Sequence, residues 1–192
     1  MNNHFRHSFV ASLYTLLCAV LIFACASTLF AQEDVKAGVN DLKAVYIFNF
    51  IRFTDWPLRT GLKRGSDVKL LVLGDRDILS TMQSIAEKKA AREIGLSVES
   101  CATDSCISAA SALFIGSGER DDYPRLLDLV AGHPVLTISD IPGFAAHGGM
   151  IEIRYDNKKL TFVVNLQAVN RSGLYISAQL LQLGEIIGRD HE

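Results

Sequence analysis

The chain has 192 residues, of which 49% are hydrophobic and 21% charged, and its formal net charge is -2. This balance is typical of a globular protein and excludes a disordered chain. It also argues against nucleic acid as a partner, because nucleic-acid binding needs a clearly basic surface.

The first 31 residues differ in kind from the rest and predict an N-terminal signal peptide, residues 1–31. Arg6 provides a weakly positive start, and no charged residue follows between Ser8 and Ala31. A cation followed by an apolar run and small residues is the composition of a secretion signal. We therefore expect an exported, periplasmic protein.

The end of this leader has three alternatives. The chain is cut after Ala26 or Ala31, is lipidated at Cys25, or keeps the segment as an anchor, because the apolar run is about 20 residues long. Export follows from each of them. The remaining part, residues 32–192, has the length of one domain.

Two of the four cysteines, Cys18 and Cys25, belong to the leader. The other two, Cys101 and Cys106, are separated by four residues that favour a turn. An exported chain with an even number of cysteines usually pairs them, so we expect a Cys101–Cys106 disulfide. The alternatives are a redox pair or half of a metal site, but a metal would need two more soft ligands, and none clusters nearby.

Along the chain, Asn40 is placed to cap a helix that runs to about Phe53 and is apolar on most sides, which predicts that it is largely buried. Trp56 and Pro57 end it. Short apolar runs and helical spacings then predict strands 68–73, 96–101, 111–116 and 135–139, and helices 77–91 and 121–131.

The last third of the chain changes character. Residues 150–155 and 160–166 alternate around a tight turn and predict an antiparallel hairpin, and a final helix is expected over 172–188. Together these elements predict the α/β class: a single three-layer domain with a mixed, partly parallel sheet, helices on both faces, and a C-terminal antiparallel hairpin plus helix.

Three strands end in loops that are rich in Gly, Asp and Ser. Because α/β proteins bind ligands at the carboxyl ends of parallel strands, Asp75, Ser117 and Asp140 are candidates for a ligand crevice. The alternative is that Asp77 and Ser117 cap helices and the glycines form turns.

Catalytic motifs find no support in the sequence. It contains no G-x-S-x-G elbow, no P-loop and no complete dinucleotide loop, and His133, His147 and His191 lack a partner at a meaningful spacing. We therefore predict a protein that is not an enzyme and needs no cofactor or metal. The glycine-containing loop 141–150, with an exposed Phe144, is the best candidate for a binding surface, and plain connection geometry is its alternative.

Several segments, in order along the chain, resemble the YfiR family: residues 43–57, Leu73-Gly74-Asp75, 134–144, 148–151 and 165–181. The family consists of exported bacterial proteins. The resemblance implies a non-catalytic periplasmic regulator that restrains a membrane-bound diguanylate cyclase or sensor by contacting its periplasmic part, and that an outer-membrane lipoprotein can sequester.

For partner contact we expect Trp56, Arg59 and Phe144, because aromatic and arginine side chains carry much of the energy of interfaces. A homodimer and a periplasmic small-ligand binding module are the alternatives. Family members often place a cysteine just before the strand that matches residues 113–115, where this chain has Ala110-Ser111-Ala112. Redox control is therefore not carried over.

Overall fold

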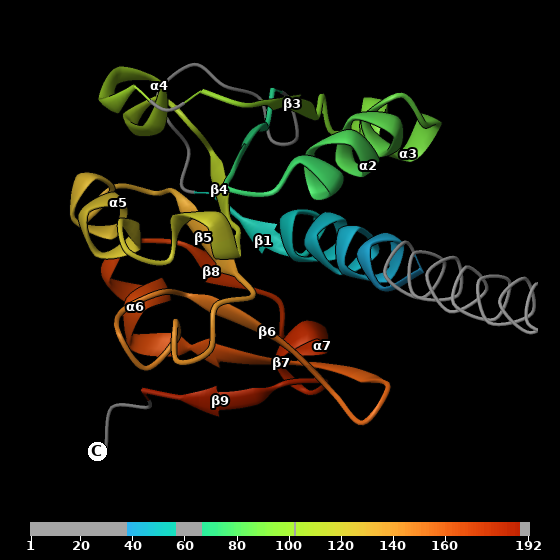
Figure 1. Cartoon of the computed structure of the whole chain (residues 1–192). Helices are drawn as coiled ribbons and strands as arrows, with labels where there is room; N and C mark the ends of the chain where they lie inside the picture. Colours follow the sequence, from blue (N-terminus) through green and yellow to red (C-terminus); the bar gives the residue numbers. More distant parts are fainter. Residues whose placement is uncertain (1–37, 57–66, 102, 189–192) are drawn as a thin grey trace, which may run out of the picture. The chain divides into compact units, whose positions relative to one another are not determined.

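The computed structural model describes residues 38–56, 67–101 and 103–188, so the predicted leader and Arg59 lie outside the described residues. A seven-stranded sheet with the strand order β3-β2-β4-β5-β6-β7-β9 forms the centre of the domain (Figure 1). Its strands are β2 (Lys69–Leu73), β3 (Ser97–Glu99), β4 (Ala112–Ile115), β5 (Leu136–Ser139), β6 (Ile151–Asp156), β7 (Lys159–Asn165) and β9 (Glu185–Ile187).

The sheet is mixed. The pairs β2–β3, β2–β4, β4–β5 and β5–β6 are parallel, β6–β7 is antiparallel, and β9 pairs parallel to β7. A separate two-stranded ribbon pairs β1 (Thr54–Asp55) with β8 (Tyr175–Ile176). The predicted mixture of parallel and antiparallel pairs is confirmed.

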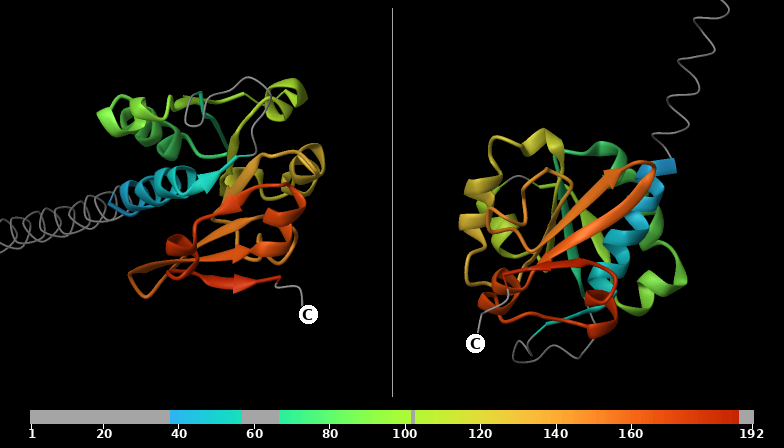
Figure 2. Two further views of the ribbon diagram at one scale, coloured as in Figure 1. Left: turned by 180° about the vertical axis from the view of Figure 1, so that it is seen from behind. Right: turned by 90° about the horizontal axis from the view of Figure 1, so that it is seen from below.

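Helices cover both faces of the sheet (Figure 2). The N-terminal helix, described over 38–52, lies on one face with α2 (Arg76–Ala86), α3 (Lys89–Glu93) and α7 (Ala178–Leu181). The other face carries α4 (Asp104–Ser108) and α5 (Tyr123–Leu129). Strand β2 is buried on both sides. Leu70 and Val72 belong to the hydrophobic core between the sheet and the N-terminal helix, which we call the first core. Leu71 and Leu73 belong to the core between the sheet and helices α4 and α5, the second core. The predicted three-layer fold is thus confirmed.

Local sequence explains the hairpin that connects β6 and β7. Its two turn residues, Asn157 and Lys158, both have positive φ angles, of 49° and 61°. A two-residue turn of this kind matches the right-handed twist of the strands, and Asn tolerates the left-handed conformation well. The register therefore pairs Asp156 with Lys159, and the predicted antiparallel hairpin is confirmed.

The N-terminal helix departs from the prediction in two ways. Asn40 is not its cap, because residues 38 and 39 are already helical, and its side-chain amide instead donates to Asp77 Oδ2 at 3.4 Å. The helix also leaves one side in solvent, where Leu42 and Val45 are 42% and 47% exposed. Its inward side consists of Ala44, Ile47, Phe50 and Ile51.

The predicted helix over 172–188 is wrong. This stretch contains β8, α7 and β9, preceded by α6 (Leu166–Arg171). Gly173 and Gly188 interrupt helical geometry with φ angles of 72° and 65°, and Gly184 packs directly on the Phe162 ring. Helix 77–91 is likewise divided into α2 and α3, because Lys88 is extended.

Candidate functional site

The carboxyl edge of the parallel strands brings the predicted ligand residues near one another but leaves little room between two of their loops. Gly118 N donates to Gly74 O at 3.2 Å. A Cβ at Gly118 would lie 2.7 Å from that same oxygen, and a Cβ at Gly116 would lie 2.7 Å from Asp75 Cβ. The loops that follow β2 and β4 therefore touch at the point where the strand order reverses, which is where such folds usually bind ligands.

Only one of the three candidate residues has a local structural role. Asp75 is the N-cap of α2, where its Oδ1 accepts a hydrogen bond from Ile78 N at 3.0 Å. The helix cap is therefore Asp75, two residues before Asp77, which the sequence predicted as the cap. Ser117 begins the short 3-10 helix η1 (Ser117–Glu119) and is exposed, with no capping hydrogen bond from its side chain.

Asp140, at the end of β5, is the third candidate and differs from the other two. Its Oδ2 accepts from Lys43 Nζ at 2.5 Å, and the two side chains are 13% and 15% exposed. Its Oδ1 is buried and has no hydrogen-bond partner in the described part of the chain. A buried carboxylate oxygen that lacks a donor is uncommon.

The loop after β5 exposes Ala146, His147 and Gly148, but its aromatic side chain is not part of that exposed surface. Phe144 is 0% exposed, and its ring packs 5.7 Å from that of Tyr123. The ring fits because Gly149 has no side chain, since a Cβ there would overlap it. The prediction that Phe144 is exposed is therefore wrong, and Phe144 belongs to the core.

Two polar side chains that the sequence analysis missed hold this loop. Glu152 Oε2 accepts from Ala145 N at 3.1 Å, and Asn165 Nδ2 donates to Ala145 O at 2.8 Å. Asn165 Oδ1 also caps α6 by accepting from Ala168 N. The sequence does hold one sign of the role of Glu152. This acid lies between Ile151 and Ile153 in a strand whose neighbouring residues are buried.

The Glu152 carboxylate is 2% exposed, yet it stays ionised for a clear reason. Burial acts to raise its pKa, but hydrogen bonds from Arg154 and from the backbone of Ala145 and Gly143 outweigh burial and hold the pKa below its ordinary value. Arg154 also forms an ion pair with Glu185 of β9, in which its Nη1 lies 2.9 Å from Glu185 Oε2. The loop is thus connected to the far edge of the sheet.

The predicted partner residue Trp56 is half-buried. Its indole Nε1 donates to Ser111 O at 3.2 Å, so the ring covers the start of β4. The ribbon beside it exposes another aromatic residue, Tyr175, which pairs with Asp55 and is 69% exposed. Large exposed aromatic side chains are common in interfaces.

The disulfide is confirmed: Cys101 and Cys106 are bonded, with their Cα atoms 6.1 Å apart. Cys106 lies inside the short helix α4, where a turn was expected, and both cysteines pack against the second core. Asp104 of the same helix forms an ion pair with Arg125 of α5. No cluster of three or more metal-ligating side chains occurs among residues 38–56, 67–101 and 103–188.

A comparison with protein families finds a match to the YfiR/HmsC-like family model over residues 40–185. The chain belongs to the YfiR/HmsC-like family. This membership supports, in general terms, a periplasmic regulatory role. In the described part of this YfiR/HmsC-like chain, no helix is both long enough and apolar enough to cross a bilayer.

A solved structure, the ABC domain in complex with L-Trp from Streptococcus pneumonia, resembles this YfiR/HmsC-like chain weakly. Its identity is 15% and its TM-score 0.49, and the match covers 62% of this chain. The matched part spans just over half, 55%, of that chain's own length. A likeness at this level carries no argument about function.

Proposed function

We propose that this protein is a non-catalytic periplasmic regulator that restrains a membrane-bound signalling protein, a diguanylate cyclase or a sensor, by contacting its periplasmic part. An outer-membrane lipoprotein that sequesters the regulator is a second partner of the proposal. Family membership over residues 40–185 is the observation that carries it. The signal peptide that the sequence predicts over residues 1–31 supports the proposal, because export would bring the protein to the required side of the membrane.

The β1–β8 ribbon is the contact surface we assign to this function. Tyr175 presents an exposed ring there, next to Asp55 and close in sequence to Trp56. An aromatic side chain contributes a large apolar area at a low entropic cost, so it is suited to anchor a partner. With Phe144 in the core, Tyr175 takes its place among the candidates.

Deletion of the gene, followed by complementation, tests the proposal. We expect deletion to raise cyclic-di-GMP and the wild-type gene to restore it, whereas Tyr175→Ala restores it poorly at an equal protein level. Tyr155→Ala is the matched control, because Tyr155 is 43% exposed on the β6 strand. Unchanged cyclic-di-GMP on deletion, together with no binding of the purified protein to periplasmic domains of membrane sensors, would refute the proposal.

Small-ligand binding is the second candidate, and the unpartnered Oδ1 of Asp140 is the observation that favours it. A ligand with an N–H or O–H group would supply the missing donor. Thermal shifts against a metabolite library test this, since a ligand that binds the folded state raises the melting temperature. A shift that Asp140→Asn abolishes supports the site, and no shift from any metabolite rejects it.

A further inference from the structure

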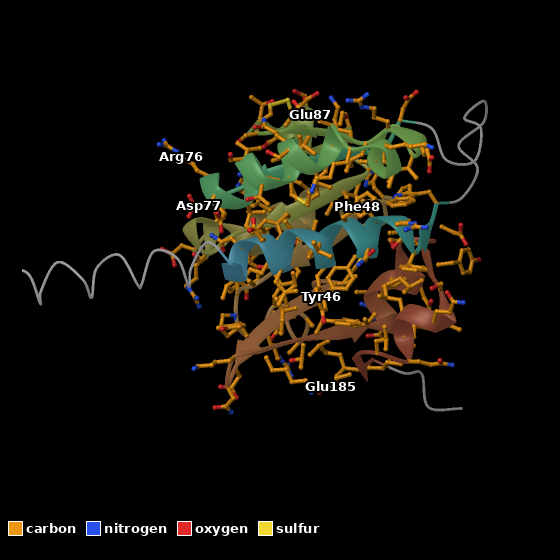
Figure 3. All side chains as sticks on the ribbon, turned by 90° about the vertical axis from the view of Figure 1, so that its right-hand side faces the viewer. Tyr46, Phe48, Arg76, Asp77, Glu87 and Glu185 are labelled. Carbon is orange, nitrogen blue, oxygen red and sulfur yellow. A yellow bond between two sulfur atoms is a disulfide. The ribbon has the colours of Figure 1, made fainter. Side chains whose placement is uncertain are left out.

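Strand β9 is a free edge of the central sheet. The strand order ends at β9, which pairs with β7 on one side. Figure 1 shows β9 as the outermost strand, with no other described element beyond it, and Figure 3 shows Glu185 at the margin of the domain. A free edge presents backbone groups that can pair with another chain.

The register identifies which backbone groups of β9 lack a partner. Asn165 N donates to Met150 O at 2.8 Å, so the backbone groups of Asn165 face β6. Successive residues of a strand alternate in this respect, so Val164 faces β9 and bonds to the residues on either side of its register partner, Ile186. The N–H and C=O of Ile186 therefore point away from the sheet. Neither group forms a hydrogen bond with another residue in the described part of the chain.

The side chains of this edge do not protect it. Natural proteins guard an exposed edge with lysine or proline, or with a bulge. Strand β9 reads Glu-Ile-Ile, so it contains neither residue type. Ile186 and Ile187 are half-buried, and Leu183, just before the strand, is 77% exposed. The opposite edge of the sheet, β3, differs because it exposes the polar residues Ser97 and Glu99.

The edge also carries an uncompensated negative charge. Arg154 forms ion pairs with both Glu152 and Glu185, so two carboxylates share one guanidinium group. Glu152 is 2% exposed, whereas the side chain of Glu185 is 60% exposed. The excess charge is therefore presented at Glu185, where a base on an added strand would balance it.

We propose that β9 binds an extended segment of a partner protein, which joins the sheet as a further edge strand. Its backbone pairs with the N–H and C=O of Ile186, an apolar side chain packs beside Ile186 and Leu183, and a lysine or arginine faces Glu185. A helix has no free backbone groups along its side, so the edge selects a strand. The β9 strand of a second copy would bring no base to Glu185. The proposal is independent of the regulatory function.

Site-specific photocross-linking tests the pairing in cells that express the full-length chain. Leu183→p-benzoylphenylalanine places a photoreactive side chain beside the edge. We expect an adduct with another protein, which mass spectrometry maps to a segment with a base next to apolar residues. Ile186→Pro, added to this variant, removes the outward N–H, and an edge strand tolerates proline at such a position. The adduct yield should fall by about tenfold, the effect of a hydrogen bond whose other partner is left unsatisfied.

Ile186→Ala is the matched control, because it shortens the same side chain but keeps the N–H, and it should retain most of the adduct. Equal melting temperatures of the two variants show that both fold. Glu185→Lys is a second variant that does not depend on proline. It should also weaken the adduct, whereas Asp156→Lys, an equal charge change on the exposed hairpin end, should not. No adduct at position 183, an adduct only with a second copy of this chain, or an adduct that neither Ile186→Pro nor Glu185→Lys weakens overturns the proposal.

Discussion

Lys43 Nζ lies 2.5 Å from Asp140 Oδ2, and this ion pair joins the N-terminal helix to the carboxyl end of β5. The two residues are 97 positions apart in the sequence. Both side chains are largely removed from water. A charge in such a place is costly without its partner, so the pair fixes the position of the helix on the sheet.

Removal of the cation from this pair should destabilise the fold. We expect Lys43→Met to lower the free energy of unfolding by about 2–3 kcal/mol, because the Asp140 carboxylate would remain buried and unpaired. Urea denaturation measures this. The double variant Lys43→Met/Asp140→Asn should lose less than the sum of the two single variants, and equal stability of Lys43→Met and wild type would contradict the assignment.

The disulfide closes a small loop, so its contribution to stability should be modest. The variant Cys101→Ser/Cys106→Ser should unfold with a free energy lower by about 2 kcal/mol, the value that loop-closure entropy gives for a ring of this size. Thermal or urea unfolding with and without reductant checks this. Reductant should lower the stability of the wild type by the same amount and leave the variant unchanged; an equal response of both proteins would argue against the bond.

Elements that local sequence determines were predicted well. The buried run of β2 and the hairpin turn at Asn157 and Lys158 follow from nearby residues, and both agree with the structure. The exposure of Phe144 and the helix over 172–188 depend on contacts between distant segments. Gly149 leaves room for the Phe144 ring, and Gly184 packs on Phe162. Neither contact can be predicted from the hydrophobic periodicity of the neighbouring residues.

The candidate site shows the same division. The disulfide could be predicted because export and cysteine number constrain it, whereas the role of Glu152 could not. From the sequence alone, a single acid in an apolar strand indicates either that the acid is exposed or that the strand has been assigned the wrong register. Only the meeting of β6 with the loop after β5 shows that Glu152 is buried and bonded to Ala145.

The Glu152 hydrogen bonds predict a pH-dependent stability. Because the pKa of Glu152 in the folded protein lies below its ordinary value of 4.5, the charged form stabilises the fold above that pH. This contribution is lost as the pH falls through the lower, folded-state pKa. We expect Glu152→Gln to cost about 1–3 kcal/mol at neutral pH, since it removes hydrogen bonds to a charged group.

The measurement is the unfolding free energy of both proteins between about pH 7 and pH 3. The difference between wild type and Glu152→Gln should shrink as the pH falls below the ordinary value of 4.5, because the unfolded wild type then binds a proton at Glu152 that the folded protein, with its lower pKa, does not yet bind. It is lost once the pH falls through the folded-state pKa. Glu185→Gln is the control, because Glu185 also binds Arg154 but its side chain is 60% exposed. A difference that stays constant over this range would show that ionisation of Glu152 plays no part.

Gly149 should be the most sensitive glycine of the loop after β5. Gly149→Ala would place a methyl group inside the volume of the Phe144 ring, and that ring is fully enclosed by the second core and cannot move aside. We expect a loss of about 2–3 kcal/mol in unfolding free energy, as for other overpacked cores.

The double variant Gly149→Ala/Phe144→Leu separates this cause from a backbone effect. A smaller side chain at position 144 makes room for the methyl group, so the double variant should lose less than the sum of the single losses. Strictly additive losses would show that the ring and the glycine do not compete for the same space.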